Sequence, residues 1–332
     1  MAIKNNIKKA LFHTIIFDFA GLFIAISTSS LLAYKLSVLE RGVVATLQAI
    51  IACLTVFSSP ITAKFELILG KNRETLKKVL VKSSTQIIPI IIFSSLILNS
   101  YSILFLKNSN LSIIIYLLIN CTLLVQFYSL LFQRLLLAKR QFKSINNYNL
   151  LSNIFYFLAL LIFTSDKTLS LDESITAYLI PSLTTFTGFY ISLNKLEKTT
   201  SSTTINYKEI KFNKKKNISI FLQDIIISTI QSGPVIIVST FFGVEMAGLY
   251  RIASTFNDLF IKIPRIINFI FKGFGLSKLG GWRRVIVMSN LTYIFILLAS
   301  LILFFFGNEI IRIIFSEKYI SGKNLAVILT FA

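Results

Sequence analysis

The chain has 332 residues, of which 55% are hydrophobic, and its 34 Lys and Arg against 14 Asp and Glu give a formal charge of +20. The apolar residues form runs of about 20, the length that crosses a hydrocarbon core of roughly 30 Å. This pattern excludes an ordinary soluble domain, which gathers its apolar residues in one core under a polar surface. Because the runs are continuous and do not alternate, it predicts an all-α, polytopic membrane protein rather than a barrel.

In chain order, the runs predict complete membrane spans at 11–33, 42–61, 84–106, 111–137, 147–165, 174–193, 218–242, 247–270 and 285–306, and a tenth that begins near Lys323. The first run follows three Lys residues, as in a signal peptide, but it is too long for one and contains Asp18, so we interpret it as an uncleaved helix. Cys53 and Cys121 both lie within predicted spans and are interpreted as packing residues.

The basic residues are distributed unequally between the two sides of the predicted membrane. With the N-terminus in the cytoplasm, the inner side receives 26 of the 34 Lys and Arg, in residues 4–9, 64–82, 134–143, 195–216 and 262–284. This is the positive-inside bias, and it predicts a multi-pass protein with a cytoplasmic N-terminus. The charge therefore requires no nucleic-acid partner, since anionic membrane lipids attract such loops.

The sequence also matches itself at one offset, 206 residues. This offset places Asp18 on Asp224, Gly42 on Gly248, and the segment LKKVLVKSS (76–84) on WRRVIVMSN (282–290). Duplicated halves are common in transporters. The offset therefore predicts an internal repeat.

The first copy holds six spans, an even number, so the two repeats are expected to be parallel and to enclose a central cavity. We predict an N-terminal six-helix lobe at 1–193, a basic cytoplasmic linker at 194–217 and a C-terminal lobe at 218–332. A complete second copy would extend well past residue 332. About 9–10 of 12 helices are thus expected here, and we expect the second repeat to be truncated, as in a fragment or an interrupted gene.

The eighth predicted span carries a polar stripe. At 100° per residue, one side of this helix holds Arg251, Thr255, Asp258, Lys262 and Arg265. A charged side chain facing lipid at the bilayer centre costs about 2.5–3.5 kcal/mol. The stripe is therefore expected to face the helix bundle or water.

Weaker polar faces occur on the second span, with Arg41 and Gln48, on the first, with Asp18, and on the seventh, with Asp224. Carboxylates inside membrane spans are typical of proton or cation relays. Simpler interpretations stay open. Asp258 and Lys262 form an i,i+4 pair, Lys262 and Arg265 suit snorkelling anchors, Arg251 suits a contact with headgroups, and Asp18 and Asp224 suit structural burial at helix ends.

Two segments resemble a known family. In FFGVEMAGLYRIAS (241–254), Phe242 and Gly243 end one helix and the G-x-Y-x-x-A pattern opens the next. In EIIRIIFSEKYISGKNLAVIL (309–329), Ser316 stands where Gly is common in that family. The first-half counterpart, LSVLERGVVATLQAI (36–50), keeps the Gly but not the Tyr. These segments are similar to the multidrug/oligosaccharidyl-lipid/polysaccharide exporter superfamily, in its O-antigen and capsular polysaccharide flippase branch.

The resemblance implies a function. Such proteins move undecaprenyl-pyrophosphate-linked oligosaccharides across the cytoplasmic (inner) membrane by alternating access, in lipopolysaccharide and capsule synthesis beside a polysaccharide polymerase and assembly proteins. It implies a net-positive cavity that binds diphosphate and sugar, with candidates Arg41, Gln48, Arg251, Thr255, Lys262 and Arg265. Ion coupling to H⁺ or Na⁺ is expected at Asp18, Asp224 or Asp258, without a bound cofactor or metal.

Three alternatives stay open. A cation-coupled drug antiporter of the same superfamily would have acidic cavity residues without the Arg and Lys. A truncated chain without activity would only occupy the membrane. A polysaccharide polymerase is disfavoured because no predicted outer loop exceeds about a dozen residues, and H-E-x-x-H, G-x-S-x-G and phosphate-loop motifs are absent from the sequence, so no catalytic residue is expected.

Overall fold

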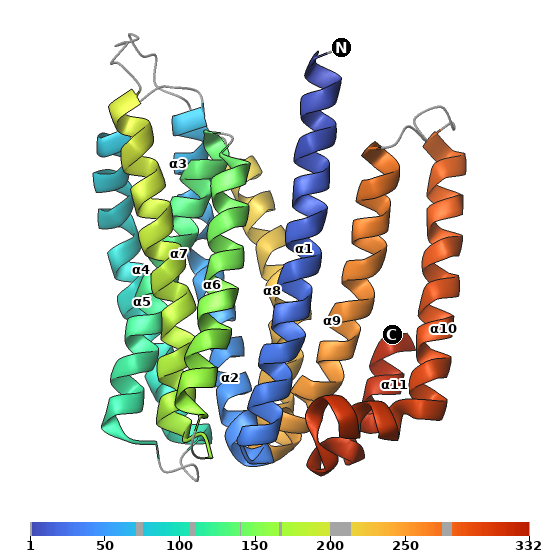
Figure 1. Ribbon diagram of the computed structural model, residues 1–332. Helices are drawn as coiled ribbons and strands as arrows, with labels where there is room; N and C mark the ends of the chain where they lie inside the picture. Colours follow the sequence, from blue (N-terminus) through green and yellow to red (C-terminus); the bar gives the residue numbers. More distant parts are fainter. Residues whose placement is uncertain are drawn as a thin grey trace. The chain divides into compact units, whose positions relative to one another are not determined.

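The computed structural model describes residues 2–70, 76–106, 111–139, 141–165, 168–199, 214–273 and 281–331. These residues are almost entirely helical and include no strand. In chain order the helices are α1 (Ala2–Lys35), α2 (Val38–Thr55), the 3₁₀ turn η1 (Val56–Ser58), α3 (Ser59–Gly70), α4 (Leu76–Phe105), α5 (Ile113–Ala138), α6 (Phe142–Phe163), α7 (Leu171–Thr199), α8 (Lys214–Phe241), α9 (Val244–Gly273), α10 (Gly281–Phe315), the 3₁₀ turn η4 (Glu317–Gly322) and α11 (Lys323–Phe331) (Figure 1).

Six stretches of these helices are long and apolar enough to cross a membrane. They are Val38–Leu69, Leu76–Phe105, Ile113–Ala138, Phe142–Phe163, Phe221–Phe241 and Ile296–Phe315, and a shorter apolar helix covers Phe19–Lys35. The prediction of an all-α fold is therefore confirmed for the described residues, and the six apolar stretches agree with a membrane protein. Each of the nine predicted spans falls on helical residues, the second of them across α2, η1 and α3, and α11 begins at Lys323 as expected. The apolar stretch of α7 is not among the six.

The outward faces of these helices carry large apolar side chains. On α4, Ile92, Leu96 and Leu104 are all more than half exposed, and Phe305 and Ile313 on α10 are similar. A water-soluble protein does not expose apolar rows of this length, whereas lipid covers them at no cost. These rows are the surfaces that the bilayer is expected to cover.

The second predicted span is broken. α2 stops at Thr55, η1 occupies Val56–Ser58, and α3 begins at Ser59, directly before Pro60. Pro60 has no N–H for the carbonyl of Val56, four residues earlier, and its ring clashes with that carbonyl. The N–H of Ser59 bonds the Val56 carbonyl instead, and the Ser58 hydroxyl donates to the Thr55 carbonyl at 2.8 Å. The break thus follows from one residue and is stabilised by its hydroxyl neighbours.

Packing divides the chain into two compact units. One contains Met1–Gly42 and Glu245–Ala332, and the other contains Val43–Val244. The first helix of the chain, α1, therefore belongs with α9, α10 and α11, whereas α8 belongs with the helices from most of α2 to α7. The first unit thus joins two segments that are far apart in the sequence, whereas the second is one continuous segment.

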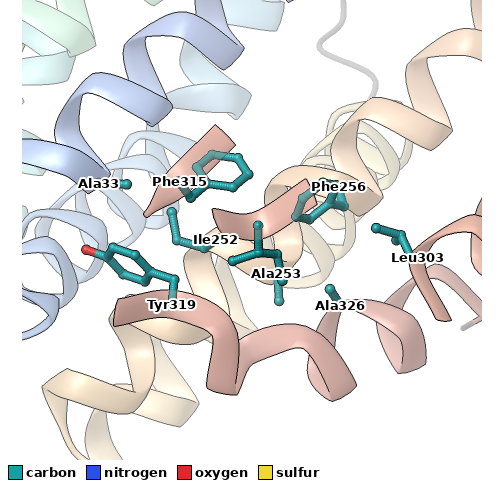
Figure 2. Close-up of a cluster of buried hydrophobic side chains, with 9 residues drawn as sticks. Ala33, Ile252, Ala253, Phe256, Leu303, Phe315, Tyr319 and Ala326 are labelled. Atoms are coloured by element: carbon teal, nitrogen blue, oxygen red, sulfur yellow. The ribbon is translucent and has the colours of Figure 1, made fainter. Parts of the chain in front are cut away.

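The unit with α1 is built on an apolar cluster from α1, α9, α10, η4 and α11. Its buried members are Ala33, Ile252, Ala253, Phe256, Leu303, Ile311, Phe315, Tyr319 and Ala326 (Figure 2). The rings of Phe256 and Phe315 meet edge to face with their centroids 5.4 Å apart. Burying this many aromatic and aliphatic groups fixes the helices of the unit on one another.

In the same unit, α1 and α10 cap each other's C-terminal ends. The Tyr34 hydroxyl of α1 donates to the carbonyls of Arg312 and Ile313, at 2.9 and 2.7 Å, and the Ser30 hydroxyl donates to the carbonyl of Ile314. In return, the Lys318 ammonium just after α10 donates to the carbonyls of Tyr34 and Leu36. The last carbonyls of a helix have no partner within it, and these bonds supply partners to several of them. The Arg312 carbonyl also accepts from the Ser316 N–H at 3.2 Å.

The other unit is centred on α5 and α7. The Phe132 ring of α5 stacks on Phe186 of α7 at 5.3 Å, and Gln126 donates to the Tyr178 hydroxyl at 2.9 Å. Neighbouring α6 approaches so closely that a Cβ at Gly188 would overlap the Tyr148 ring. The short spacing between these helices is typical of membrane bundles, where small residues set the approach.

Candidate functional site

Three charged side chains from three helices meet in the unit Val43–Val244. The guanidinium Nη2 of Arg134 on α5 lies 3.3 Å from Asp224 Oδ2 on α8, and its Nη1 lies 3.6 Å from Glu66 Oε2 on α3. A fourth residue, Ser59, donates its hydroxyl to the same Asp224 oxygen at 2.5 Å. We call Ser59, Glu66, Arg134 and Asp224 the charged centre.

The positions of these residues along their helices explain why they meet. Glu66 lies three residues before the end of the apolar stretch Val38–Leu69, and Arg134 lies four before the end of Ile113–Ala138. Asp224 lies on α8, six residues after the start of the predicted span 218–242. At about 1.5 Å per residue, the first two lie roughly 5 Å and Asp224 roughly 9 Å inside an apolar segment. The charged centre is therefore at one edge of the apolar zone.

The charges of the centre do not cancel. Two carboxylates face one guanidinium, which leaves a formal charge of −1 when both acids are ionised. The three side chains are 21–30% exposed, so they are shielded from water yet still reachable. A cation binding there, or a proton binding to either acid, would neutralise the excess, and carboxylates inside membrane proteins commonly serve that purpose.

The helix break lies next to the centre. Ser59, which bonds Asp224, is the first residue of α3 and closes the 3₁₀ turn through its N–H. About one turn further along α8, the Ser228 hydroxyl lies 3.6 Å from the sulfur of Cys53 on α2. The seam between the broken helix and α8 is thus polar on both sides of the break. A 3₁₀ turn inside a long helix often marks a hinge.

The structure describes the side chains of part of the polar stripe predicted on α9. Arg251 Nη1 lies 3.5 Å from Asp258 Oδ2, two turns away on the same helix, and the Thr255 hydroxyl donates to the Arg251 carbonyl at 2.9 Å. Arg251 is about one-third exposed and Asp258 about half exposed. Lys262 and Arg265 lie on α9, but their side chains are outside the described residues.

The remaining predicted residues fall in different surroundings. Arg41 is only 3% exposed, and its Nη2 donates to the Ser29 hydroxyl of α1 at 3.1 Å. Gln48 is half-buried on α2. Asp18 lies on α1, with its side chain outside the described residues. The structure brings Arg251 to Asp258 and Arg41 to Ser29, whereas Asp224 and Gln48 belong to the other unit.

Sequence reasoning found Asp224 but missed both of its charged neighbours. Arg134 was interpreted only as one of the basic residues that set the topology, and Glu66 received no role. One signal was present: Ser59 and Glu66 are seven residues apart and so share a helix face, inside a span long enough to cross the membrane. The meeting with Arg134 depends on tertiary packing and has no counterpart in the local sequence.

The comparisons with known proteins give no further identification. No protein-family model matches the chain, and neither a curated protein nor a solved structure matches it.

Proposed function

We propose that the chain is an ion-coupled membrane transporter, a flippase that moves lipid-linked oligosaccharides across the cytoplasmic membrane. The observation that carries this proposal is the charged centre, in which Arg134 lies between Glu66 and Asp224 at the edge of three membrane helices. Charges at such positions are costly, and in membrane proteins they mark ion and substrate pathways. A structural role alone does not require two acids for one cation.

The carboxylates supply the coupling. The negative charge of either acid is neutralised when it binds a proton or a sodium ion, and Asp224 is joined to the break at Pro60 through Ser59. A change of charge beside a hinge gives a direct route from ion binding to helix movement.

The substrate class rests on the basic residues and on the resemblance of the segments 241–254 and 309–329. A sugar–diphosphate carries hydroxyl groups and an anion that must be shielded from hydrocarbon. Arg251, on the α9 stripe, supplies a guanidinium group that suits phosphate oxygens, whereas Arg41 is buried beside Ser29. With the basic loops on the cytoplasmic side, the charged centre would face the leaflet in which such precursors are made.

The bounds of the helices support an internal repeat. α1 ends at Lys35 and α8 at Phe241, while α2 begins at Val38 and α9 at Val244. Both pairs are 206 residues apart, the offset at which the sequence matches itself. A transporter of two parallel repeats around a cavity would have this correspondence.

A cation-coupled antiporter is the second candidate function. It is favoured by the excess negative charge of Glu66 and Asp224, which suits a cationic substrate better than an anionic one. The two proposals differ in the charge of the transported molecule, so one strain can test both.

The test is a deletion of the gene in its native cell. We expect loss of surface polysaccharide and accumulation of lipid-linked repeat units on the cytoplasmic leaflet. Wild-type chain should restore the polymer, and Arg134→Ala should not. Arg312→Ala is the matched control, because Arg312 forms an exposed ion pair with Glu317 at 3.1 Å that is worth little. Unchanged polymer together with lost efflux of cationic drugs would favour the antiporter and contradict the flippase.

A further inference from the structure

We propose that Arg134 exchanges partners during transport: when Asp224 takes up a proton, Arg134 is released to bind a phosphate of the substrate. This inference rests on the proposed flippase function and assigns to the charged centre both the coupling step and an anchor for the diphosphate. The anion class is a phosphate group, whether it belongs to the lipid carrier or to a membrane headgroup.

The geometry of the centre suits an exchange. Strong charge-assisted hydrogen bonds between guanidinium and carboxylate are about 2.7–2.9 Å long and often bidentate. Here Arg134 meets each acid through a single pair of atoms, at 3.3 Å for Asp224 and 3.6 Å for Glu66. The guanidinium is therefore held loosely by two partners rather than locked by one.

Of the two acids, Asp224 makes the contacts of the charged centre that depend most directly on its charge. Its Oδ2 accepts from the Ser59 hydroxyl at 2.5 Å and also faces Arg134. Once that carboxylate is protonated, its attraction for the guanidinium is lost, but a hydrogen bond with Ser59 remains available in either direction. Protonation thus removes the Arg134 partner without leaving Asp224 unpaired.

Access to solvent distinguishes Arg134 from Arg41, and its partners on other helices distinguish it from Arg251. Arg134 is 28% exposed, whereas Arg41 is 3% exposed and its bond to Ser29 is buried. A phosphate can therefore reach Arg134 without unpacking the helices around it. Arg251 is similarly exposed, but the pair that it forms with Asp258 lies within one helix and couples no other element.

The step balances in protons and charge. Asp224 gains one O–H bond as the proton arrives from water, and its charge falls from −1 to 0. Arg134 keeps its charge and exchanges a carboxylate for a phosphate oxygen, so each bound anion is accompanied by one proton. No other covalent bond forms or breaks.

Among the residues that the structure describes, two other titratable groups face this site. Glu66 approaches Arg134 from α3, and the Cys53 thiol of α2 contacts Ser228 about one turn along α8 from Asp224. Of the two acids, Asp224 has the shorter contact with the guanidinium and the bond to the helix break, so its protonation changes the most interactions of the centre. It is the acid that we assign as the proton acceptor, and Glu66 is the control.

The experiment measures proton uptake on ligand binding by the full chain in phosphatidylcholine nanodiscs. The probe is undecaprenyl diphosphate, titrated calorimetrically in two buffers of different ionisation enthalpy. For wild type we expect up to one proton per ligand beyond that of the probe itself, and a fall in affinity as pH rises, by up to about tenfold per pH unit. Asp224→Asn should bind at least about tenfold more tightly than wild type at the highest pH tested, without the extra proton. Glu66→Gln should keep the uptake, and Arg134→Gln should lose affinity by at least about tenfold.

The outcomes separate this inference from the function on which it rests. Binding without extra proton uptake, and with Asp224→Asn unchanged, would overturn the exchange and leave the flippase intact. Loss of the uptake in Glu66→Gln alone would also overturn it, because Asp224 would not be the acceptor. An absence of binding in both wild type and Asp224→Asn would contradict the substrate class itself. If phosphatidylglycerol in the disc produced the same uptake without the probe, the anion would be a headgroup, and the assignment to the carrier would fall.

Discussion

Gly248 on α9 lies so close to the carbonyl oxygen of Val38 on α2 that a Cβ atom at Gly248 would overlap it. The same Cβ would lie 3.1 Å from the amide nitrogen of Gly42, the residue that the sequence repeat pairs with Gly248. The atoms in the way belong to the main chain and cannot rotate aside. Here the glycine is required by the close approach of two helices.

Gly248→Ala should therefore destabilise the protein, although alanine is the better helix former. We expect a loss of about 1–3 kcal/mol, the usual cost of overpacking, measured as a lower Tm of the purified chain in detergent. Gly233→Ala on α8 is the control, because its Cβ would meet only a Thr229 methyl at 3.3 Å. An unchanged Tm for Gly248→Ala would mean that α2 and α9 are farther apart at this point than in the structure.

Ser316→Gly should stabilise the protein. Ser316 has φ 94° and ψ 155°, a region that is essentially restricted to glycine and costs other residues about 1–3 kcal/mol. Glycine relieves that strain but adds entropy to the unfolded chain, so we expect a net gain of about 1 kcal/mol in the free energy of unfolding. Ser321→Gly in the same turn lacks the positive φ and should give no gain. A loss of stability in Ser316→Gly would contradict the strain.

Tyr319→Phe should change how stability depends on alkaline pH. Burial raises the pKa of Tyr319 to about 12, against a smaller opposing effect of Arg41. A raised pKa in the folded state contributes stability that is fully present below about pH 10 and is lost as pH rises through about 12. Denaturant unfolding at pH 8 and pH 11.5 should show this loss in wild type and a smaller one in Tyr319→Phe.

The same variant should be nearly neutral at pH 8, because the buried Tyr319 hydroxyl makes no hydrogen bond within the described part of the chain. Tyr293→Phe, which removes an exposed hydroxyl, should keep the alkaline loss because Tyr319 is retained. An equal loss in Tyr319→Phe and wild type would assign the effect to another group.

Arg134→Gln should destabilise the charged centre by about 2 kcal/mol, since it leaves Glu66 and Asp224 facing each other without a cation. Adding Asp224→Asn should recover most of that loss, because one of the two negative charges is then gone. A thermal unfolding series of the two single variants and the double variant measures the coupling. Strict additivity would show that the three charges do not interact.

The positions of the helices could be predicted from the sequence, but the contacts between helices could not. Apolar runs placed each predicted span on a helix, because a bilayer imposes length and composition on each segment separately. The break at Val56–Ser58 was missed, although Pro60 is its cause, because the apolar run continues across it. The meeting of Glu66 with Arg134 joins residues 68 positions apart, which local patterns do not encode. The strain at Ser316 was foreshadowed only by the glycine common in the resembling family.

The mutual capping of α1 and α10 has a consequence for how the protein is made. The Tyr34 hydroxyl leaves the ribosome 278 residues before the Arg312 carbonyl that accepts its bond. At roughly 5–20 residues per second, α1 waits roughly 15–55 s for its partner helix. Throughout that interval the first helix must lie in the bilayer, or against a chaperone. Its Ser30 and Tyr34 hydroxyls then lack the α10 carbonyls that later accept their hydrogen bonds. Substitutions at Ser30 or Tyr34 are thus expected to lower the amount of folded protein made in the cell more than they lower the stability of the finished fold.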